Sequence, residues 1–173
     1  MIEIRRLGPA DVQEANLPNE PFPLWGRLIP ALENGVWNWR TEVFPERTEM
    51  CFPDYPYDPA DENAVFLAAC EDGVCTGLAV LRKAMFRYLY LDDLKVCRAY
   101  RGKGVGSRLI EACMDEAAAA GMQGIYVVAQ DNNLDACLFY LHRGFAIGGF
   151  DNRAYRGTPQ AHKADIYFYR DCT

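Results

Sequence analysis

A glycine-rich stretch, RAYRGKGVGSRL at 98–109, constrains the fold more than any other feature of this sequence. It follows a run rich in β-forming residues at 87–97, and it leads into an amphipathic helix that we predict over 107–121. A helix N-terminus binds anions because its first N–H groups have no partner within the helix, and glycine leaves those groups accessible. The glycines could also simply tighten the connection, but the surrounding cations favour a phosphate-binding turn.

The remaining pattern indicates an α+β fold with a mixed, mostly antiparallel central sheet flanked by helices. A hairpin turn, EDGV, joins two early strands, and later strands alternate with helices. We expect strands at 2–7, 64–70, 74–85, 87–97, 124–130, 145–150 and 164–170. A second helix is expected at 133–144, opened by Asp131 or Asn132 and ended by Gly144.

Proline and tryptophan are concentrated near the start of the chain. Nine of the ten prolines precede residue 60, and all three tryptophans lie in the same part. Proline disrupts helix interiors and central strands. We therefore predict short helices and loops after the opening strand, including a helix over 24–37 that breaks near Pro30 and Gly35.

Charge and cysteine content argue against several classes of protein. The net charge of −6, from 18 basic and 24 acidic residues, disfavours nucleic acid as a partner. No apolar run is long enough to span a membrane, and the N-terminus lacks a signal-peptide core, so we expect a cytoplasmic protein with no membrane partner. Seven cysteines without a CxxC pair, and only two histidines, predict free and mostly buried thiols and no metal site.

The spacing of the glycines narrows the type of phosphate ligand. The Walker pattern is absent, and Ser107 replaces the last glycine of the dinucleotide fingerprint. The spacing that fits is R-x-x-G-x-G, in Arg101, Gly104 and Gly106. It resembles the acyl-CoA diphosphate loop of the GCN5-related N-acetyltransferase (GNAT) family. A second stretch, NLDACLFYLHRGF at 133–145, resembles that family's N-x-x-A-x-x-(L/F)-Y-x-x-x-G-F helix.

This resemblance implies the fold outlined above, with acetyl-CoA as the cofactor. It implies one domain over 1–173, in which 1–63 shapes the substrate site and 64–170 binds the cofactor. N–H groups of the turn would wrap the diphosphate, and the strand at 87–97 would pair with the pantetheine arm. The cofactor-binding residues expected from the family are Leu94, Lys95, Val96, Arg101, Gly102, Lys103, Gly104, Val105, Gly106, Ser107, Asn133 and Tyr140.

The resemblance also assigns catalytic roles. A phenol with a pKa of about 10 stays protonated at neutral pH, so Tyr140 is the expected proton donor to the departing thiolate, although a helical tyrosine is more often a packing residue. Asp92 and Asp93 are the candidates for the base. Neighbours in a strand face opposite ways, so we expect only one of them to face the acetyl group, and we favour Asp92, with a water between. Either could instead bind the substrate's ammonium group or pair with a structural arginine.

Three further stretches, at 26–37, 132–140 and 148–157, are similar to the streptothricin acetyltransferases within this family. This implies direct transfer of the acetyl group to a primary amine of a small cationic antibiotic, with the β-lysine amine of streptothricin as the candidate acceptor. The substrate-binding residues expected on this basis are Trp37, Asp92, Asp151 and Tyr155. The acidic run between residues 42 and 72 suits such a substrate but also suits a solvated surface.

Several alternatives stay open at this point. The three tryptophans, Trp25, Trp37 and Trp39, form either an aromatic wall for a cation or a small core, and we favour the core. The acceptor could be a protein or peptide amine. The chain could also be a regulatory module that binds acyl-CoA without transferring the acetyl group. Dimers are common in folds of this kind, so a homodimer is a further expectation.

Overall fold

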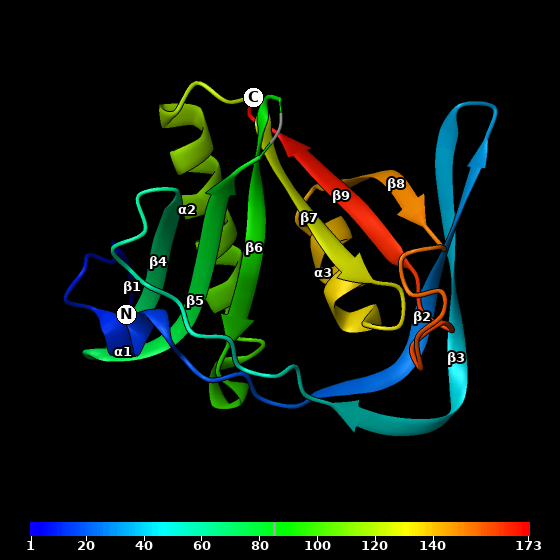
Figure 1. Cartoon of the computed structure of the whole chain (residues 1–173), viewed down its shortest axis with the longest axis horizontal. Helices are drawn as coiled ribbons and strands as arrows, with labels where there is room; N and C mark the ends of the chain where they lie inside the picture. Colours follow the sequence, from blue (N-terminus) through cyan, green and yellow to red (C-terminus); the bar gives the residue numbers. More distant parts are fainter. Residues whose placement is uncertain (85) are drawn as a thin grey trace. The chain divides into compact units, whose positions relative to one another are not determined.

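A computed structural model describes residues 1–84 and 86–173. The chain divides into two compact units, which we call unit 1 and unit 2. Unit 1 comprises 1–21, 51–125 and 171–173, and unit 2 comprises 22–50 and 126–170. Each unit therefore combines an early and a late part of the chain (Figure 1). The predicted division at residue 63 between substrate and cofactor parts stays a prediction.

Unit 1 is built on antiparallel strands in the order β1-β4-β5-β6. Their bounds are β1 Ile2–Arg6, β4 Ala64–Glu71, β5 Val74–Lys83 and β6 Tyr88–Val96, with a short helix α1 at Val12–Ala15, a 3₁₀ turn η1 at Arg98–Tyr100 and a long helix α2 at Val105–Ala119. The predicted hairpin between β4 and β5 is confirmed, because Asp72 and Gly73 both adopt the positive φ angles that such a turn requires. The predicted strand over 74–85 ends at Lys83, and its position 85 lies outside the described residues.

The core of unit 1 follows from the packing of α2 on the sheet. All four residues of its predicted apolar stripe are buried: Leu109, Ile110, Cys113 and Ala117. A side chain at Gly77 of β5 would come within 3.1 Å of Val105 and Leu109 of α2, so the glycine allows the helix to lie close to the strand. A second apolar cluster, which includes Phe66, Leu78 and Val80, gathers residues from β4, β5 and α1.

Unit 2 begins with a long hairpin that the sequence analysis did not predict. The helix expected over 24–37 is wrong: β2 runs over Phe22–Glu33 and β3 over Val36–Met50, and the two pair antiparallel. Asn34 and Gly35 form a two-residue turn with φ angles of 51° and 78°, and this Asn-Gly pair is the strongest short-range hairpin signal. Pro30 ends no element, since it lies within β2 opposite Trp39.

The rest of unit 2 contains β7, β9 and β8, in that order in the sheet, and one helix. Their bounds are β7 Gly124–Gln130, whose first two residues belong to unit 1, α3 Leu134–His142, β8 Ala146–Asp151 and β9 Asp165–Asp171, whose last residue belongs to unit 1. The N-cap of α3 is Asn133 rather than Asp131 or Asn132. Gly144 ends the helix as predicted, with a φ of 82°.

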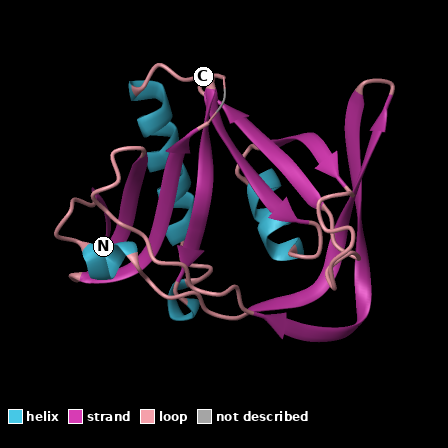
Figure 2. Ribbon diagram, in the orientation of Figure 1, coloured by secondary structure: helices cyan, strands magenta, loops and turns pink. Residues whose placement is uncertain are grey.

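The predicted fold class is confirmed: few helices accompany a central sheet that is mostly antiparallel (Figure 2). Within the described ranges, no helix is both long and apolar enough to cross a membrane. The thiols are free, as expected, but only Cys113 and Cys137 are buried, whereas Cys51 is exposed and the others are half-buried. The described residues contain no group of three or more His, Cys, Asp or Glu side chains that could hold a metal ion.

Candidate active site

The predicted phosphate-binding turn lies in unit 1, immediately before α2. Gly102 and Gly104 have φ angles of 75° and 86°, a left-handed backbone conformation that residues other than glycine rarely adopt. A Cβ atom added at either glycine would meet nothing within 4 Å, so the space above the turn is open. The glycines therefore set the backbone conformation of the turn and leave its surface accessible to a ligand.

The start of α2 provides backbone donors at this turn. The first helical hydrogen bond runs from the N–H of Arg108 to the carbonyl oxygen of Gly104, at 3.1 Å. The N–H groups of Val105 and Gly106 therefore precede the hydrogen-bond ladder of the helix. The first turn of α2 contains no acidic residue that would compete for an anion. This geometry suits a bound phosphate.

The basic side chains around the turn contact the protein itself. Arg101 donates from Nε to the carbonyl oxygen of Val96 at 3.0 Å and from Nη1 to that of Pro21 at 2.8 Å. Lys103 lies with its Nζ 5.3 Å from the centre of the Tyr100 ring. Arg101 thus links the end of β6 to the segment before β2, and these bonds hold the first residue of the turn in place.

Both candidate bases on β6 form ion pairs. Asp92 Oδ2 lies 2.8 Å from Arg82 Nε, and Arg82 also contacts Asp61 at 2.8 Å. Asp93 Oδ2 lies 3.0 Å from Lys95 Nζ. The alternative in which an aspartate pairs with a structural arginine is therefore confirmed for Asp92.

A β-bulge explains why the carboxylates of Asp92 and Asp93 both have partners around the ring of Tyr57. Asp93 pairs with Val80 and Leu91 with Leu81, which leaves Asp92 as the extra residue in β6. The expectation that these two neighbours face opposite ways is therefore wrong. Asp93 accepts a hydrogen bond from the Tyr57 hydroxyl at 3.2 Å, and the arginine that binds Asp92 has its Cζ 6.0 Å from the centre of the same ring.

Tyr57, which sequence reasoning missed, is at the centre of this cluster. Lys95 Nζ lies 5.8 Å from the centre of its ring, so cations approach the ring from both Arg82 and Lys95. Burial, followed by the charges of Asp93 and Asp92, raises the pKa of the phenol well above its ordinary value. Tyr57 therefore stays protonated and keeps donating to the carboxylate. Its only sequence signal is an aromatic residue within the proline-rich segment DYPYDPADE.

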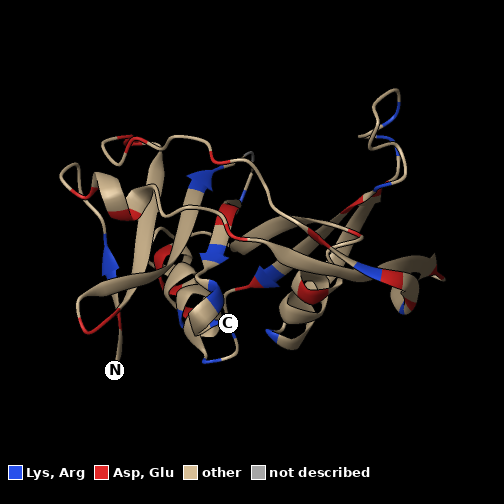
Figure 3. Cartoon of the chain, turned by 90° about the horizontal axis from the view of Figure 1, so that it is seen from below, with Lys and Arg blue, Asp and Glu red and all other residues tan. Residues whose placement is uncertain are grey.

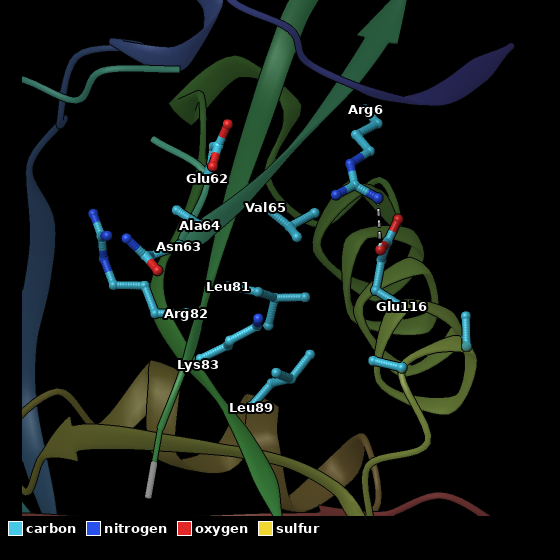
Figure 4. Close-up of a pocket in the computed structure, with 12 residues that line it drawn as sticks. Arg6, Glu62, Asn63, Ala64, Val65, Leu81, Arg82, Lys83, Leu89 and Glu116 are labelled. Carbon is cyan, nitrogen blue, oxygen red and sulfur yellow. Dashed lines mark hydrogen bonds and ion pairs between the residues drawn. The ribbon is translucent and has the colours of Figure 1, made fainter. Parts of the chain in front are cut away.

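A pocket of about 380 Å³ in unit 1 contains none of the predicted site residues (Figure 4). Apolar side chains such as Val65, Leu81 and Leu89 line it, and the ion pair of Arg6 with Glu116, at 3.2 Å, closes one side. No predicted catalytic or cofactor-binding group lines this pocket, so we do not place the reaction there.

In unit 2, the predicted proton donor lies in an aromatic cluster. Tyr140 of α3 is only 7% exposed. Its ring contacts those of Phe139, Phe145 and Phe168, with centroids 5.3 to 5.7 Å apart. Asn133 caps the same helix, since its Oδ1 accepts from the N–H of Ala136 at 3.2 Å. Packing thus fixes the phenol ring of Tyr140 within α3.

A second polar network in unit 2 contains two of the predicted substrate-binding residues. The Tyr155 hydroxyl donates to Asp165 at 2.7 Å and accepts from Gln130 at 3.1 Å. Asp151 is the cross-strand partner of Asp165, so two carboxyl groups stand opposite each other. Burial, together with the charge of Asp151, raises the pKa of Asp165, although the Tyr155 hydrogen bond lowers it. Burial and the hydrogen bond to Asp165 raise the pKa of Tyr155 to about 12.

Sequence reasoning missed Asp165 and Gln130 in this network. Asp165 begins a strand and Gln130 ends one, and neither belongs to a recognisable motif. Their position could have indicated them: Gln130 ends β7 and Asp165 begins the neighbouring strand β9, so both polar residues lie at the same end of the sheet.

The tryptophans do not form the small core that we favoured. Trp39 is 46% exposed, and Trp25 donates from its indole nitrogen to Asp135 at 2.8 Å. Trp37 and Trp39 instead line a pocket of about 420 Å³ together with Leu141 and Ile147. This pocket lies within unit 2 and provides an aromatic surface that remains accessible.

Comparison with known proteins identifies the chain's relatives. The profile of the Acetyltransferase (GNAT) family matches residues 33–145. Streptothricin acetyltransferase A of Bacillus subtilis (strain 168) is 34% identical over 170 residues, which cover 96% of this chain and 98% of that protein. A Bacillus anthracis crystal structure, described as a streptothricin acetyltransferase in complex with acetyl coenzyme A, is 31% identical with a TM-score of 0.90 over 99% of both chains. Nourseothricin acetyltransferase shares the fold, with a TM-score of 0.82 at 22% identity over 99% of both chains.

Proposed function

The chain belongs to the GNAT acetyltransferase family, and on that premise we propose that it transfers an acetyl group from acetyl-CoA to a primary amine of a small cationic molecule. It is an N-acetyltransferase related to the streptothricin acetyltransferases. The observation that carries the choice of substrate is the match to the Bacillus subtilis enzyme over 96% of this chain. Because that match includes the β2–β3 hairpin, and not only the family motifs, the β-lysine amine of streptothricin is our candidate acceptor.

The cofactor is acetyl-CoA, and the turn at 101–107 is where we place its diphosphate. The open space over Gly102 and Gly104 and the helix N-terminus beside it support this placement. Val105 and Gly106 would offer N–H groups, while Arg101 holds the turn in position through its bonds to backbone carbonyls. Lys103 adds positive charge close to the turn. The backbone of Leu94, Lys95 and Val96 is our proposed pairing partner for the pantetheine arm.

Acetyl-CoA, when bound, supplies the acetyl group as an activated thioester. The chain must hold two protons in the right place for the transfer. We propose that Tyr140 donates one from its Oη to the departing sulfur, and the aromatic packing around its ring supports a fixed orientation. Asn133 is proposed to bond the cofactor arm in addition to capping α3.

The second proton comes from the acceptor amine, which arrives mostly charged because its pKa is about 10. Asp92 and Asp93 are the proposed acceptors, through a water. Their ion pairs with Arg82 and Lys95 each use one carboxylate oxygen, Oδ2, in the contacts described above. The bulge that places both aspartates around Tyr57 supports a shared role for the two carboxylates.

We place recognition of the cationic substrate on unit 2. The opposed carboxyl groups of Asp151 and Asp165 supply negative charge, and Tyr155 and Gln130 supply neutral hydrogen-bonding groups beside them. The aromatic face of Trp37 would pack against the rest of a cationic ligand.

A thiol-release assay with acetyl-CoA tests the proposal, using an amine panel that includes streptothricin, free lysine and lysine-containing peptides. We expect turnover on streptothricin. Turnover on peptides alone would make the acceptor a protein amine, and cofactor binding without turnover on any amine would make the chain a regulatory module. Tyr140→Phe should lose at least about tenfold in kcat, because general acid catalysis contributes 10²–10⁴-fold, while acetyl-CoA still binds. Unchanged kcat in this variant would remove Tyr140 from the mechanism.

A further inference from the structure

Strand β3 is unusual because it has 15 residues and none of them is buried. Val36, Trp39 and Val43 are 60%, 46% and 67% exposed, although they are apolar. A two-stranded hairpin is marginally stable in water unless something covers it. Within its own unit, β3 therefore leaves apolar side chains exposed along much of its length.

The other strand of the hairpin, β2, already contacts the rest of unit 2. Leu28 of β2 donates its N–H to the carbonyl oxygen of Asp131 at 3.0 Å. Gly26 lies so close to Leu134 of α3 that an added Cβ would come within 2.8 Å of it. In the part of the chain that the structure describes, β2 is the one sheet neighbour of β3. The outer edge of β3 is thus available to a further strand.

The sequence of β3 complements itself in one antiparallel register. When Thr41 faces Thr41 of a second copy, Arg40 faces Glu42 of that copy, and Trp39 faces its Val43. Two-fold symmetry allows only registers in which one residue faces its own copy. The two neighbouring registers of this kind place Arg40 opposite Arg40, or Glu42 opposite Glu42, which like-charge repulsion disfavours.

We propose that two copies of this chain pair through β3, antiparallel, about a two-fold axis at Thr41. The ladder extends over 39–43, because the pairing of β3 with β2 becomes irregular between Val43 and Thr48, and Pro45 has no N–H to donate. Glu42 then lies between Arg27 of its own chain, at 3.0 Å, and Arg40 of the second copy. Figure 3 shows acidic and basic segments close together on this hairpin.

This pairing also covers apolar surface. Trp37, Trp39, Thr41 and Val43 alternate along β3 and so share one face of the hairpin. Val43 of the second copy would lie beside Trp39, at the aromatic side of the 420 Å³ pocket. The inference does not depend on the acetyl-transfer reaction, since it concerns only the assembly of the chain.

A cysteine at the symmetry axis tests the register directly. Thr41→Cys, made in a Cys51→Ser background because Cys51 is an exposed free thiol, should form a disulfide-linked dimer under mild oxidation. Thr48→Cys in the same background is the matched control: it is an exposed threonine on the same strand, but its copy would lie roughly 45 Å away. We expect a covalent dimer for Thr41→Cys alone. Equal cross-linking of both variants, or of neither, would overturn the proposal.

Charge substitutions test the same register without a covalent bond. Trp39→Lys and Val43→Glu should each raise the dimer dissociation constant by roughly tenfold in sedimentation velocity, because each spoils two symmetry-related apolar pairs. The double variant restores a lysine–glutamate pair at both places, so it should dimerise better than either single variant. Val74→Lys, at an equally exposed apolar residue of unit 1, is the control and should not change dimerisation. A wild-type chain that stays monomeric at every concentration, or a double variant weaker than both singles, would refute the pairing.

Discussion

Replacing Gly104 by alanine tests whether backbone N–H groups hold the cofactor's diphosphate. Gly104 has a φ of 86°, and a Cβ there would meet no atom within 4 Å, so the cost to the free protein is backbone strain without any clash. A left-handed alanine costs roughly 1–2 kcal/mol in the free energy of unfolding. For a chain of 173 residues, this lowers the melting temperature by roughly 2–8 °C.

Gly73→Ala is the matched control for this change. Gly73 has a φ of 82°, and an added Cβ there would also meet nothing within 4 Å, but it lies in the β4–β5 hairpin turn. Both variants should lose similar stability in thermal unfolding. Only Gly104→Ala should weaken acetyl-CoA binding, by roughly 10- to 100-fold, because a methyl group or a relaxed turn removes a charge-assisted hydrogen bond worth about 1.5–3 kcal/mol.

Calorimetric titration with acetyl-CoA distinguishes the two effects. If both variants bind acetyl-CoA as tightly as the wild-type chain while losing similar stability, the turn does not hold the diphosphate. If both bind it more weakly to the same extent, the loss reflects general destabilisation. Either result would refute the reasoning about the turn.

Three other substitutions follow from the contacts. Arg82→Gln leaves Asp61 and Asp92 without their shared cation, and because all three side chains are about one-third exposed, urea denaturation should show a loss of only about 1 kcal/mol; an unchanged midpoint would contradict this. Burial raises the folded-state pKa of Asp165 above its unfolded value, so the folded chain binds more protons between the two values and stability falls as pH rises through that range. Asp165→Asn should therefore be more stable than the wild type at neutral pH, with a difference that shrinks on acidification, and equal midpoints at neutral pH would argue against it. Asn133→Ala should lose about 1 kcal/mol with the helix cap, and a raised KM for acetyl-CoA in the same variant would add the proposed cofactor contact.

The elements of unit 1 could be predicted from the sequence because local chemistry decided them. Asp72 and Gly73 specify a tight turn, and the apolar stripe of α2 has helical spacing. The β2–β3 hairpin was missed because prolines and tryptophans were weighed above the Asn34–Gly35 turn. Proline is tolerated in edge strands, and both strands of a two-stranded sheet are edge strands, so Pro30 can lie within β2.

Candidate site residues could be named from the sequence, but their contacts could not. The bulge at Asp92 arises from the pairing of β6 with β5, and no local sequence pattern in β6 predicts it. Tyr57 joins the aspartates from a segment distant in sequence, and Asp165 meets Asp151 only through strand pairing. Such long-range partners depend on tertiary structure, which a single sequence does not specify by inspection.

Arg101 holds backbone segments together through its guanidinium group. Its guanidinium donates to the carbonyl oxygens of Val96 and Pro21, so we expect its removal to alter the path of the main chain more than the local electrostatic potential. Affinity for acetyl-CoA that rests on peptide dipoles should also vary little with ionic strength, unlike affinity that rests on mobile surface cations. Arg101 would then stabilise the backbone of the turn, and its substitution would make the conformation of the turn less well defined.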